Sequence, residues 1–361
     1  MELVRFRGPD GPRVGVSAAG RVSELASVKS MSELLAMPLL ELRALVEDAA
    51  RTSGDGLPAS QVELLAPVDG RTEVWASGVT YEVSREARME ESRHAATVYE
   101  RVYDAERPEL FFKAASWRVA GDGDPIAIRE DSTLDVPEPE VAIMLNRSGE
   151  VVGYTACNDV SSRSIEGDNP LYLPQAKIYL GSCALGPVVR PAWEVADPYD
   201  LTIELVIERD GKTVWEGATS TAKLHRRYDE LAGYLFRADR YPEGAVLSTG
   251  TCLVPEAPFG LAPGDMVRVK VAGIGTLSNP VVRGLAALEA HASPELRRAL
   301  APNGKAPAGE DGGAAPAGED RRAAPAGEDR RAAPAGEDRR AVPAGEDGGA
   351  APAGEDRRPV P

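Results

Sequence analysis

The stretch from Asp135 to Leu145, DVPEPEVAIML, opens a strongly apolar run with two glutamates that lie two residues apart. Side chains of a β-strand alternate between its two faces, so Glu138 and Glu140 would share one face. The opposite face is apolar and is expected to join the core: Pro139, Val141, Ile143 and Leu145. Neighbouring carboxylates repel each other, so some partner must hold the two glutamates at this end of the strand.

The following run, GEVVGYTACNDVSSR at residues 149–163, is the natural partner strand, entered through a turn at residues 147–150. Antiparallel pairing would return Asp159 to the end that carries Glu138 and Glu140. Three carboxylates with room for water suit Mg²⁺, Mn²⁺ or Ca²⁺, whereas zinc favours His and Cys ligands. Alternatively, the glutamates are solvent-facing charges that protect an edge strand from aggregation. Spacing leaves both interpretations open.

Composition excludes several classes of function. The 361 residues carry 57 acidic and 41 basic side chains, a net charge of −16, which disfavours binding to a nucleic-acid backbone.

The cysteines, Cys157, Cys183 and Cys252, are odd in number and widely spaced, so buried thiols are expected rather than disulfides or a zinc site. The first residues lack a signal-peptide core, and no segment reaches the roughly 18 apolar residues of a membrane span. A cytoplasmic protein without a membrane partner is expected.

The pattern along the chain divides it into three parts. Residues 1–67 predict a small N-terminal α/β unit, with a hairpin around Gly-Pro-Asp-Gly and a helix over residues 30–50. Residues 68–295 alternate short aliphatic runs with turn signals, including a hairpin at 201–217, and contain one helix at about 226–238; this predicts a β-rich α+β domain. Residues 301–361 repeat PAGED every nine residues without an aromatic residue, which predicts disorder.

Residues 80–105 form a special segment within the second part. A short strand, EVWASGV, leads into a charged helix with a weak apolar face. Such a helix has little to hold it against a core, so the segment is interpreted as a candidate lid.

An ordered set of motifs resembles the fumarylacetoacetate hydrolase superfamily over about residues 75–290. The motifs are EPE at 138–140, NDVSSR at 158–163, Lys177, Gly250-Thr251, and GIGTLSNPVV at 273–282. The resemblance implies a mixed-sheet roll, a divalent metal held by Glu138, Glu140 and Asp159, and a homodimer or homotetramer.

NPLYLPQAKIY at 169–179 resembles the 2-keto-3-deoxy-D-arabinonate dehydratase branch of that superfamily. The branch implies Mg²⁺-dependent loss of water from a 2-keto-3-deoxy sugar acid, such as 2-keto-3-deoxy-D-arabinonate giving 2,5-dioxopentanoate, in sugar-acid catabolism. One alternative is a hydrolase that cleaves C–C bonds of acylpyruvates or 2,4-diketo sugar acids. Another is a non-catalytic metal-binding scaffold whose repeat tail binds partners.

The candidate lid separates the first two possibilities. Hydrolytic relatives carry a lid histidine in an NY-x-x-H pattern, whereas here Tyr81 is followed three residues later by Ser84. His94 lies ten residues further along, too far for a small shift to replace it. The missing histidine favours the dehydratase. Cys252 also stands where many relatives have proline, a change that we do not translate into function.

The resemblance also suggests roles around the metal. Lys177 is the first candidate for the catalytic base, or alternatively a structural ion pair with a ligand glutamate. Glu109, in PELFFKA, is a candidate acid for the leaving hydroxide, or alternatively a surface glutamate. Arg163 either holds the substrate carboxylate or orients the metal loop. The expected substrate-binding residues are Arg163, Gln175, Thr251 and Tyr81.

Overall fold

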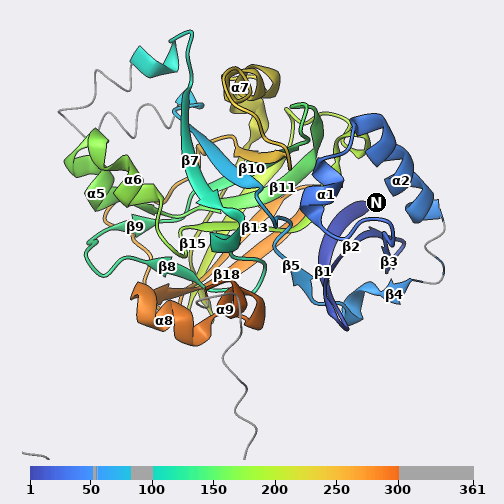
Figure 1. Cartoon of the computed structure of the whole chain (residues 1–361). Helices are drawn as coiled ribbons and strands as arrows, with labels where there is room; N and C mark the ends of the chain where they lie inside the picture. The colour runs from blue at the N-terminus through green and yellow to red at the C-terminus, as the bar shows by residue number, and fades with distance from the viewer. Residues whose placement is uncertain (52–53, 55, 83–100, 301–361) are drawn as a thin grey trace, which may run out of the picture. The chain divides into compact units, whose positions relative to one another are not determined.

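The computed structural model describes residues 1–51, 54, 56–82 and 101–300, which belong to one compact unit, Met1–Gly309 (Figure 1). Most of the candidate lid and all of the repeat tail lie outside the described residues, so both remain predictions. The division of the chain near residue 67 also remains a prediction.

The N-terminal residues form the predicted hairpin and two helices where the pattern predicted one. Strands β1 (Glu2–Gly8) and β2 (Gly11–Ala18) pair antiparallel. The helical stretch splits into α1 (Met31–Leu35) and α2 (Leu39–Arg51). The break falls at Pro38, which has no backbone N–H and disfavours helical geometry in the residue before it.

A large sheet joins these N-terminal strands to the rest of the unit. Its strand order is β4-β3-β2-β1-β13-β11-β10-β16-β6-β7, with β5 paired to β1. The remaining bounds are β3 Arg21–Glu24, β4 Leu57–Pro58, β5 Leu64–Leu65, β6 Glu73–Gly78, β7 Glu109–Ala115, β10 Pro139–Leu145, β11 Val151–Asp159, β13 Cys183–Pro191 and β16 Ala245–Ser248. Pairing is antiparallel except between β16 and β6.

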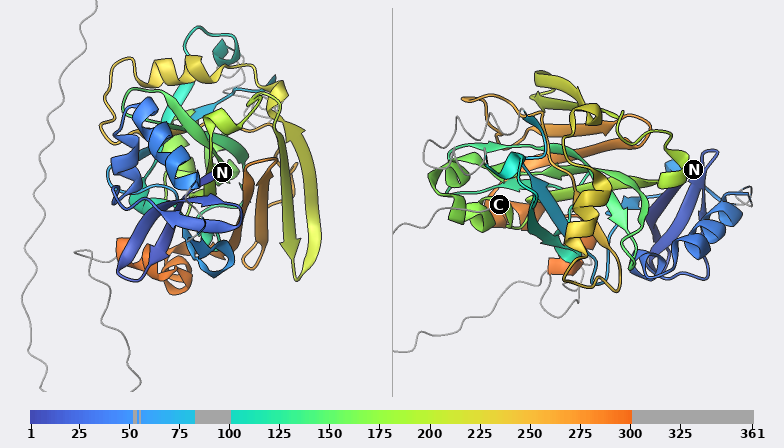
Figure 2. Two further views of the ribbon diagram at one scale, coloured as in Figure 1. Left: turned by 90° about the vertical axis from the view of Figure 1, so that its right-hand side faces the viewer. Right: turned by 90° about the horizontal axis from the view of Figure 1, so that it is seen from above.

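A second sheet of five strands has the order β15-β14-β17-β18-β8. Its olive and orange-brown strands lie side by side in the left view of Figure 2. The bounds are β8 Ile126–Ile128, β14 Thr202–Arg209, β15 Lys212–Ser220, β17 Met266–Val271 and β18 Gly275–Arg283. Strands β14 and β15 are the predicted hairpin, and its turn contains Asp210, whose φ is 52°, and Gly211. The parallel pairing of β18 with β8 makes this sheet mixed as well. The predicted β-rich, mixed-sheet fold is confirmed.

Helices are more numerous among the described residues than the pattern predicted. The expected helix is present as α7 (Tyr228–Leu235). The helices missed are α5 (Arg163–Asp168), α6 (Leu173–Lys177), α8 (Gly284–His291) and α9 (Pro294–Leu300). Helices α5, α6 and α9 have five to seven residues, which is too short to establish a helical period in the sequence. Helix α8, GLAALEAH, has eight residues like α7, but its apolar residues do not form one face.

Strand β10 lies between two apolar clusters. Val141, Ile143 and Leu145 pack in the cluster that includes Ile203 and Val269 of the second sheet, as the alternation predicted. The opposite face is also buried, because Ala142 and Met144 join a cluster with residues of α1 and α2. The glutamates therefore lie at the end of a strand that is covered on both sides.

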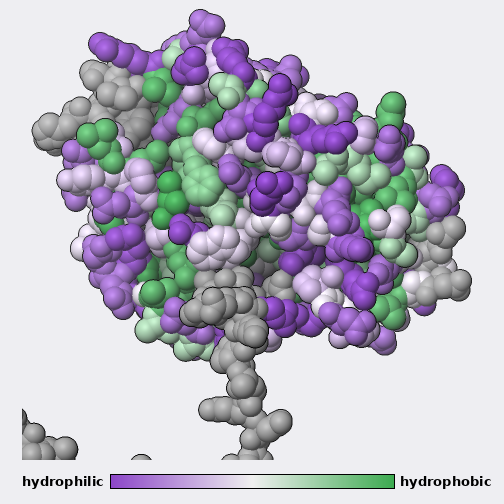
Figure 3. Space-filling model, in the orientation of Figure 1, coloured by the Kyte–Doolittle hydropathy of each residue, from purple (hydrophilic) through white to green (hydrophobic). Residues whose placement is uncertain are grey.

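Hydrophilic side chains are spread over the face of the unit shown in Figure 3, with hydrophobic ones scattered among them. Cys157 and Cys183 are buried free thiols and Cys252 is a half-buried one. Within the described residues, no helix combines the length and apolar character needed to cross a membrane.

Candidate active site

The β10–β11 hairpin brings three carboxylates to one place, as the sequence predicted. Glu140 lies opposite Cys157, and the Asp159 backbone N–H donates to the Glu138 carbonyl at 3.0 Å. Glu138, Glu140 and Asp159 each offer one carboxylate oxygen, and these oxygens lie within 4.8 Å of one another. All three side chains are buried. No other such group of acidic, histidine or cysteine side chains occurs in the described part of the chain.

These residues fit a hard divalent cation. The donor set consists of oxygen alone, and buried carboxylates at this spacing need a positive partner. Mg²⁺ prefers such oxygen ligands and keeps several waters, whereas zinc would favour His or Cys. The observed geometry therefore supports the predicted metal site over exposed edge charges.

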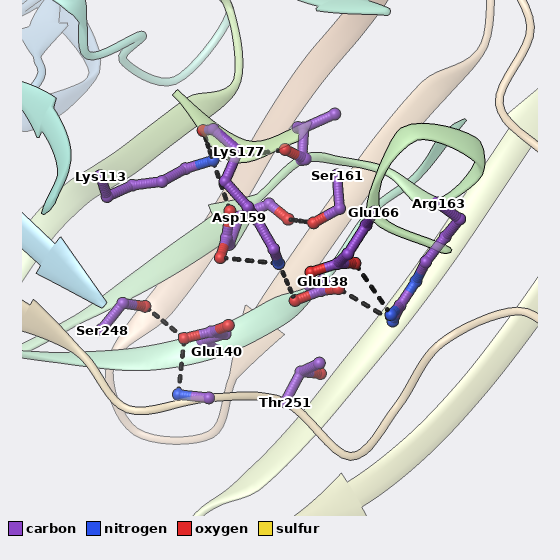
Figure 4. Close-up of polar contacts among 12 residues, drawn as sticks. Lys113, Glu138, Glu140, Asp159, Ser161, Arg163, Glu166, Lys177, Ser248 and Thr251 are labelled. Carbon is purple, nitrogen blue, oxygen red and sulfur yellow. Dashed lines mark hydrogen bonds and ion pairs between the residues drawn. The ribbon is translucent and has the colours of Figure 1, made fainter. Parts of the chain in front are cut away.

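Two cationic side chains pair with Glu138 (Figure 4). Lys177 donates from Nζ to Glu138 Oε2 at 2.7 Å and to Asp159 Oδ2 at 3.1 Å. Arg163 Nη2 lies 2.9 Å from Glu138 Oε1, while its Nη1 donates to Glu166 Oε2 at 3.3 Å. Arg163 thus links Glu138 to Glu166, and both of its predicted roles, holding the substrate carboxylate or orienting the metal loop, remain predictions.

Glu140 has a different environment. Its Oε2 accepts hydrogen bonds from Ser248 Oγ at 2.5 Å and from the Gly250 backbone N–H at 2.7 Å. Burial and, to a lesser extent, the charges of Asp159 and Glu138 raise the pKa of Glu140 to about 8, although the hydrogen bond from Ser248 and the charge of Lys177 act to lower it. The raised pKa favours the protonated form of Glu140 in the metal-free protein.

Glycine is required at position 250 for this hydrogen bond. Gly250 has a φ of +90°, and an added Cβ would lie 2.1 Å from Thr80 Oγ1 and 2.9 Å from the Ser77 carbonyl. Only glycine adopts this conformation readily and lets the backbone approach so closely. The Gly250-Thr251 motif thus delivers a backbone donor to Glu140.

One pocket collects most of the predicted site residues. It is lined by Glu109, Thr251, Arg163 and Lys177 together with the three metal-binding candidates. Glu109 lies opposite Gly78 across β7 and β6, and a Cβ at Gly78 would meet Glu109 Oε2 at 2.1 Å. Glycine at this position therefore allows the Glu109 carboxylate to fold back over the backbone.

Two expected substrate contacts lie elsewhere. The Gln175 side chain is exposed, and the backbone carbonyl of Gln175 accepts a hydrogen bond from Arg129 Nη1 at 3.2 Å. Tyr81 is 1 % exposed, and its backbone forms an isolated antiparallel β-bridge with Leu224. Burial raises the pKa of the Tyr81 hydroxyl, and the negative charges of neighbouring groups add to this effect. Neither side chain lines the pocket, so their substrate roles remain predictions.

Sequence reasoning missed three buried polar residues of the site. Lys113 forms an ion pair with Asp159 Oδ1, Glu166 pairs with Arg163, and Ser248 donates to Glu140. The sequence offered a signal for one of them, because Glu166 lies three residues after Arg163 in a helix.

Comparison with known proteins gives consistent matches. The family described as "Fumarylacetoacetate (FAA) hydrolase C-terminal" matches residues 74–282. A probable 2-keto-3-deoxyxylonate dehydratase of Haloferax volcanii is 51% identical over 251 residues, covering 66% of this chain and 86% of that protein. A 2-dehydro-3-deoxy-D-arabinonate dehydratase of Saccharolobus solfataricus is 45% identical over 225 residues, covering 62% of this chain and 75% of that protein.

A solved structure extends the similarity to three dimensions. It is 2-keto-3-deoxy-D-arabinonate dehydratase complexed with magnesium and 2,5-dioxopentanoate. The TM-score is 0.67 at 36% sequence identity, and the match covers 79% of this chain and 99% of that chain.

Proposed function

Since the chain belongs to the fumarylacetoacetate hydrolase family, we propose that it removes water from a 2-keto-3-deoxy sugar acid in a Mg²⁺-dependent reaction. Substrates of this class are 2-keto-3-deoxy-D-arabinonate and 2-keto-3-deoxyxylonate. The chain is thus a metal-dependent hydro-lyase of sugar-acid catabolism. The observation that carries this function is the buried triad of Glu138, Glu140 and Asp159 beside Lys177, in a chain half identical to a dehydratase.

Glu138, Glu140 and Asp159 would hold the ion. When bound, Mg²⁺ supplies Lewis-acid polarisation of the 2-keto group, which acidifies the protons on C3. Burial of the triad lowers the local dielectric and so strengthens the electrostatic interactions of these carboxylates. Arg163 keeps Glu138 oriented through its Nη2, and Thr251 presents a hydroxyl beside the same pocket for the substrate carboxylate.

Lys177 and Glu109 are proposed as the base and the acid. Lys177 Nζ lies among the carboxylates that bind the ion, and in its neutral form it would accept a proton from C3. Glu109 lines the same pocket and would donate a proton to the hydroxyl that leaves C4. One proton and one hydroxide leave as water. Tautomerisation then moves hydrogen from C5 and its hydroxyl to C3 and C4, which gives the 2,5-dioxo acid.

A substrate panel tests this function. We expect Mg²⁺-dependent conversion of 2-keto-3-deoxy-pentonates, which EDTA abolishes and added Mg²⁺ restores. Exposed Glu256 offers a matched control, so Glu256→Gln should retain the activity that Glu138→Gln loses. Release of pyruvate from acylpyruvates, with the pentonates untouched, would establish the hydrolase instead. Protein that binds Mg²⁺ and converts neither class would support the scaffold.

The assembly state and the cellular location remain predictions. The resemblance implies a homodimer or homotetramer, and the sequence pattern implies a cytoplasmic protein. Measuring the mass of the full chain in solution by light scattering tests the first of these; a monomer would contradict it.

A further inference from the structure

Lys113 makes contacts that the proposed reaction has not yet used. It lies on β7, and its side chain is fully buried although it carries a charge. Its Nζ forms an ion pair with Asp159 Oδ1 and donates to the carbonyls of Lys177 and, at 3.3 Å, Val160. A lysine ammonium has three N–H donors, so all three have an acceptor in the site.

These acceptors come from two segments that must be placed together. Asp159 and Val160 stand at the end of β11, where the third metal-binding carboxylate lies. Lys177 ends α6 and presents the candidate base. The Lys177 carbonyl also accepts from Ser182 Oγ at 2.8 Å, so two hydrogen bonds fix the backbone that carries the base.

An irregularity in the sheet explains how the lysine reaches both segments. Val74 of β6 pairs with Ala114 of β7, but the next residue, Trp75, pairs with Phe112. Lys113 has no partner across the ladder and occupies a β-bulge. Bulges redirect a side chain and are enriched near active sites.

The buried charge of Lys113 is costly unless it is fully paired, and here each partner belongs to the candidate site. We infer that Lys113 is a positioning residue, which holds Asp159 and the Lys177 backbone in the arrangement that metal binding and proton transfer require. This inference rests on the proposed function for its catalytic part. Its metal-binding part does not depend on which substrate the protein turns over.

The test compares Lys113→Met, Lys113→Arg and a control, Lys270→Met. Lys270 pairs with Glu204 at 2.9 Å on the second sheet and is half exposed, so its variant removes one surface charge only. Calorimetry of Mg²⁺ binding is the first measurement. We expect about 10- to 100-fold weaker binding for Lys113→Met, the range for residues that orient metal ligands, and no change for Lys270→Met.

Steady-state kinetics of 2-keto-3-deoxy-pentonate dehydration at saturating Mg²⁺ is the second measurement. Lys113→Arg keeps a positive charge beside Asp159. Its planar guanidinium, however, cannot place its N–H donors as the three donors of an ammonium group are placed. We expect it to bind Mg²⁺ within about threefold of wild type and to lose at least about tenfold in kcat with little change in KM, since the Lys177 backbone is displaced.

Three outcomes are informative. If Lys113→Met does not fold, the test rests on Lys113→Arg. A wild-type kcat in Lys113→Arg would overturn the inference. A lower melting temperature with wild-type Mg²⁺ affinity in Lys113→Met would also overturn it, because Lys113 would then be purely structural. Failure of wild type to dehydrate any pentonate refutes the proposed function instead, while the Mg²⁺ measurements still test the positioning of Asp159.

Discussion

Two buried acidic regions of this protein behave differently. Asp265 is fully buried, and its carboxylate accepts two hydrogen bonds from Arg209, at 2.6 and 2.8 Å, and one from the Ala262 backbone N–H at 2.9 Å. The site on the β10–β11 hairpin has three such carboxylates within 4.8 Å. Asp265 is matched by one arginine. In the site, Lys113, Lys177 and Arg163 pair with Glu138 and Asp159, whereas the donors to Glu140 are Ser248 and the Gly250 backbone. The convergence of three acids, rather than burial alone, indicates a cation site.

The largest expected effect comes from removing one of the converging charges. Glu138→Gln keeps the shape of the side chain and deletes a metal ligand that also pairs with Lys177 and Arg163. We expect kcat/KM to fall by at least about 1,000-fold, equivalent to about 4 kcal/mol of transition-state stabilisation. Measuring kcat/KM and the Mg²⁺ dissociation constant together checks this. Wild-type Mg²⁺ affinity in the variant would refute the assignment of Glu138 as a ligand.

The next prediction distinguishes loss of the general acid from loss of metal binding. In Gly78→Ala the new Cβ would lie 2.1 Å from Glu109 Oε2, so the end of a flexible side chain must move. If Glu109 protonates the leaving hydroxyl, we expect a loss of about 100-fold in kcat, the lower end for general acid–base catalysis. Mg²⁺ affinity should stay at the wild-type value, because Glu109 is outside the triad.

Glu109→Gln is the matched variant for this second prediction. It should lose a similar factor in kcat, and combining it with Gly78→Ala should add little, because both changes act on one carboxylate. Additive losses in the double variant would show that Gly78 acts by another route.

The pH dependence of metal binding gives a smaller effect. In the metal-free protein the pKa of Glu140 is raised from 4.5 to about 8, mainly by burial. Mg²⁺ must displace that proton, so the apparent affinity should rise by up to about tenfold per pH unit below 8 and level off above it. Calorimetry at pH 7 in two buffers of different ionisation enthalpy should count about one proton released per ion. Release of no proton would contradict the raised pKa.

The raised pKa of Glu140 also makes the stability of the folded protein depend on pH. A carboxyl whose pKa is raised in the folded state stabilises the protein fully below its unfolded pKa and loses that contribution as pH rises through the folded pKa. The metal-free protein should therefore become less stable between about pH 4.5 and 8 from this group, and Mg²⁺ should offset the loss. Denaturant unfolding with EDTA and with Mg²⁺ measures both curves.

Part of this site was predictable from local rules alone. The two-residue period placed Glu138 and Glu140 on one face, and the turn at 147–150 returned Asp159 to them, because an antiparallel hairpin fixes its own register. Lys177 and Thr251 were identified only through resemblance, because Lys177 contacts Asp159 from 18 residues further along the chain and Thr251 lines the pocket from a still more distant segment. The β-rich class followed from the density of strand and turn signals, whereas the mixed sheets were expected only from the family resemblance.

Other features depended on geometry that the sequence does not display. The bulge at Lys113 interrupts alternation, so its approach to Asp159 could not be read from spacing. Gln175 and Lys177 were expected in one pocket, but they stand two residues apart in a helix, where side chains point about 200° apart. Lys177 consequently faces the carboxylates, while Gln175 is exposed.

The smallest expected effect on turnover belongs to the other acidic region. Asp265→Asn leaves Arg209 without its carboxylate partner. Breaking a buried ion pair lowers the free energy of unfolding by about 3 to 5 kcal/mol. Because the Arg209 side chain is partly exposed, we expect the lower end of that range or less. Urea unfolding should register this as a lower midpoint, whereas kcat and Mg²⁺ affinity should equal those of wild type at a temperature where the variant is folded. If Asp265→Asn instead weakened Mg²⁺ binding as strongly as Glu138→Gln, burial of an acid would matter more than convergence. The distinction between a completed ion pair and a cation site would then fail for this protein.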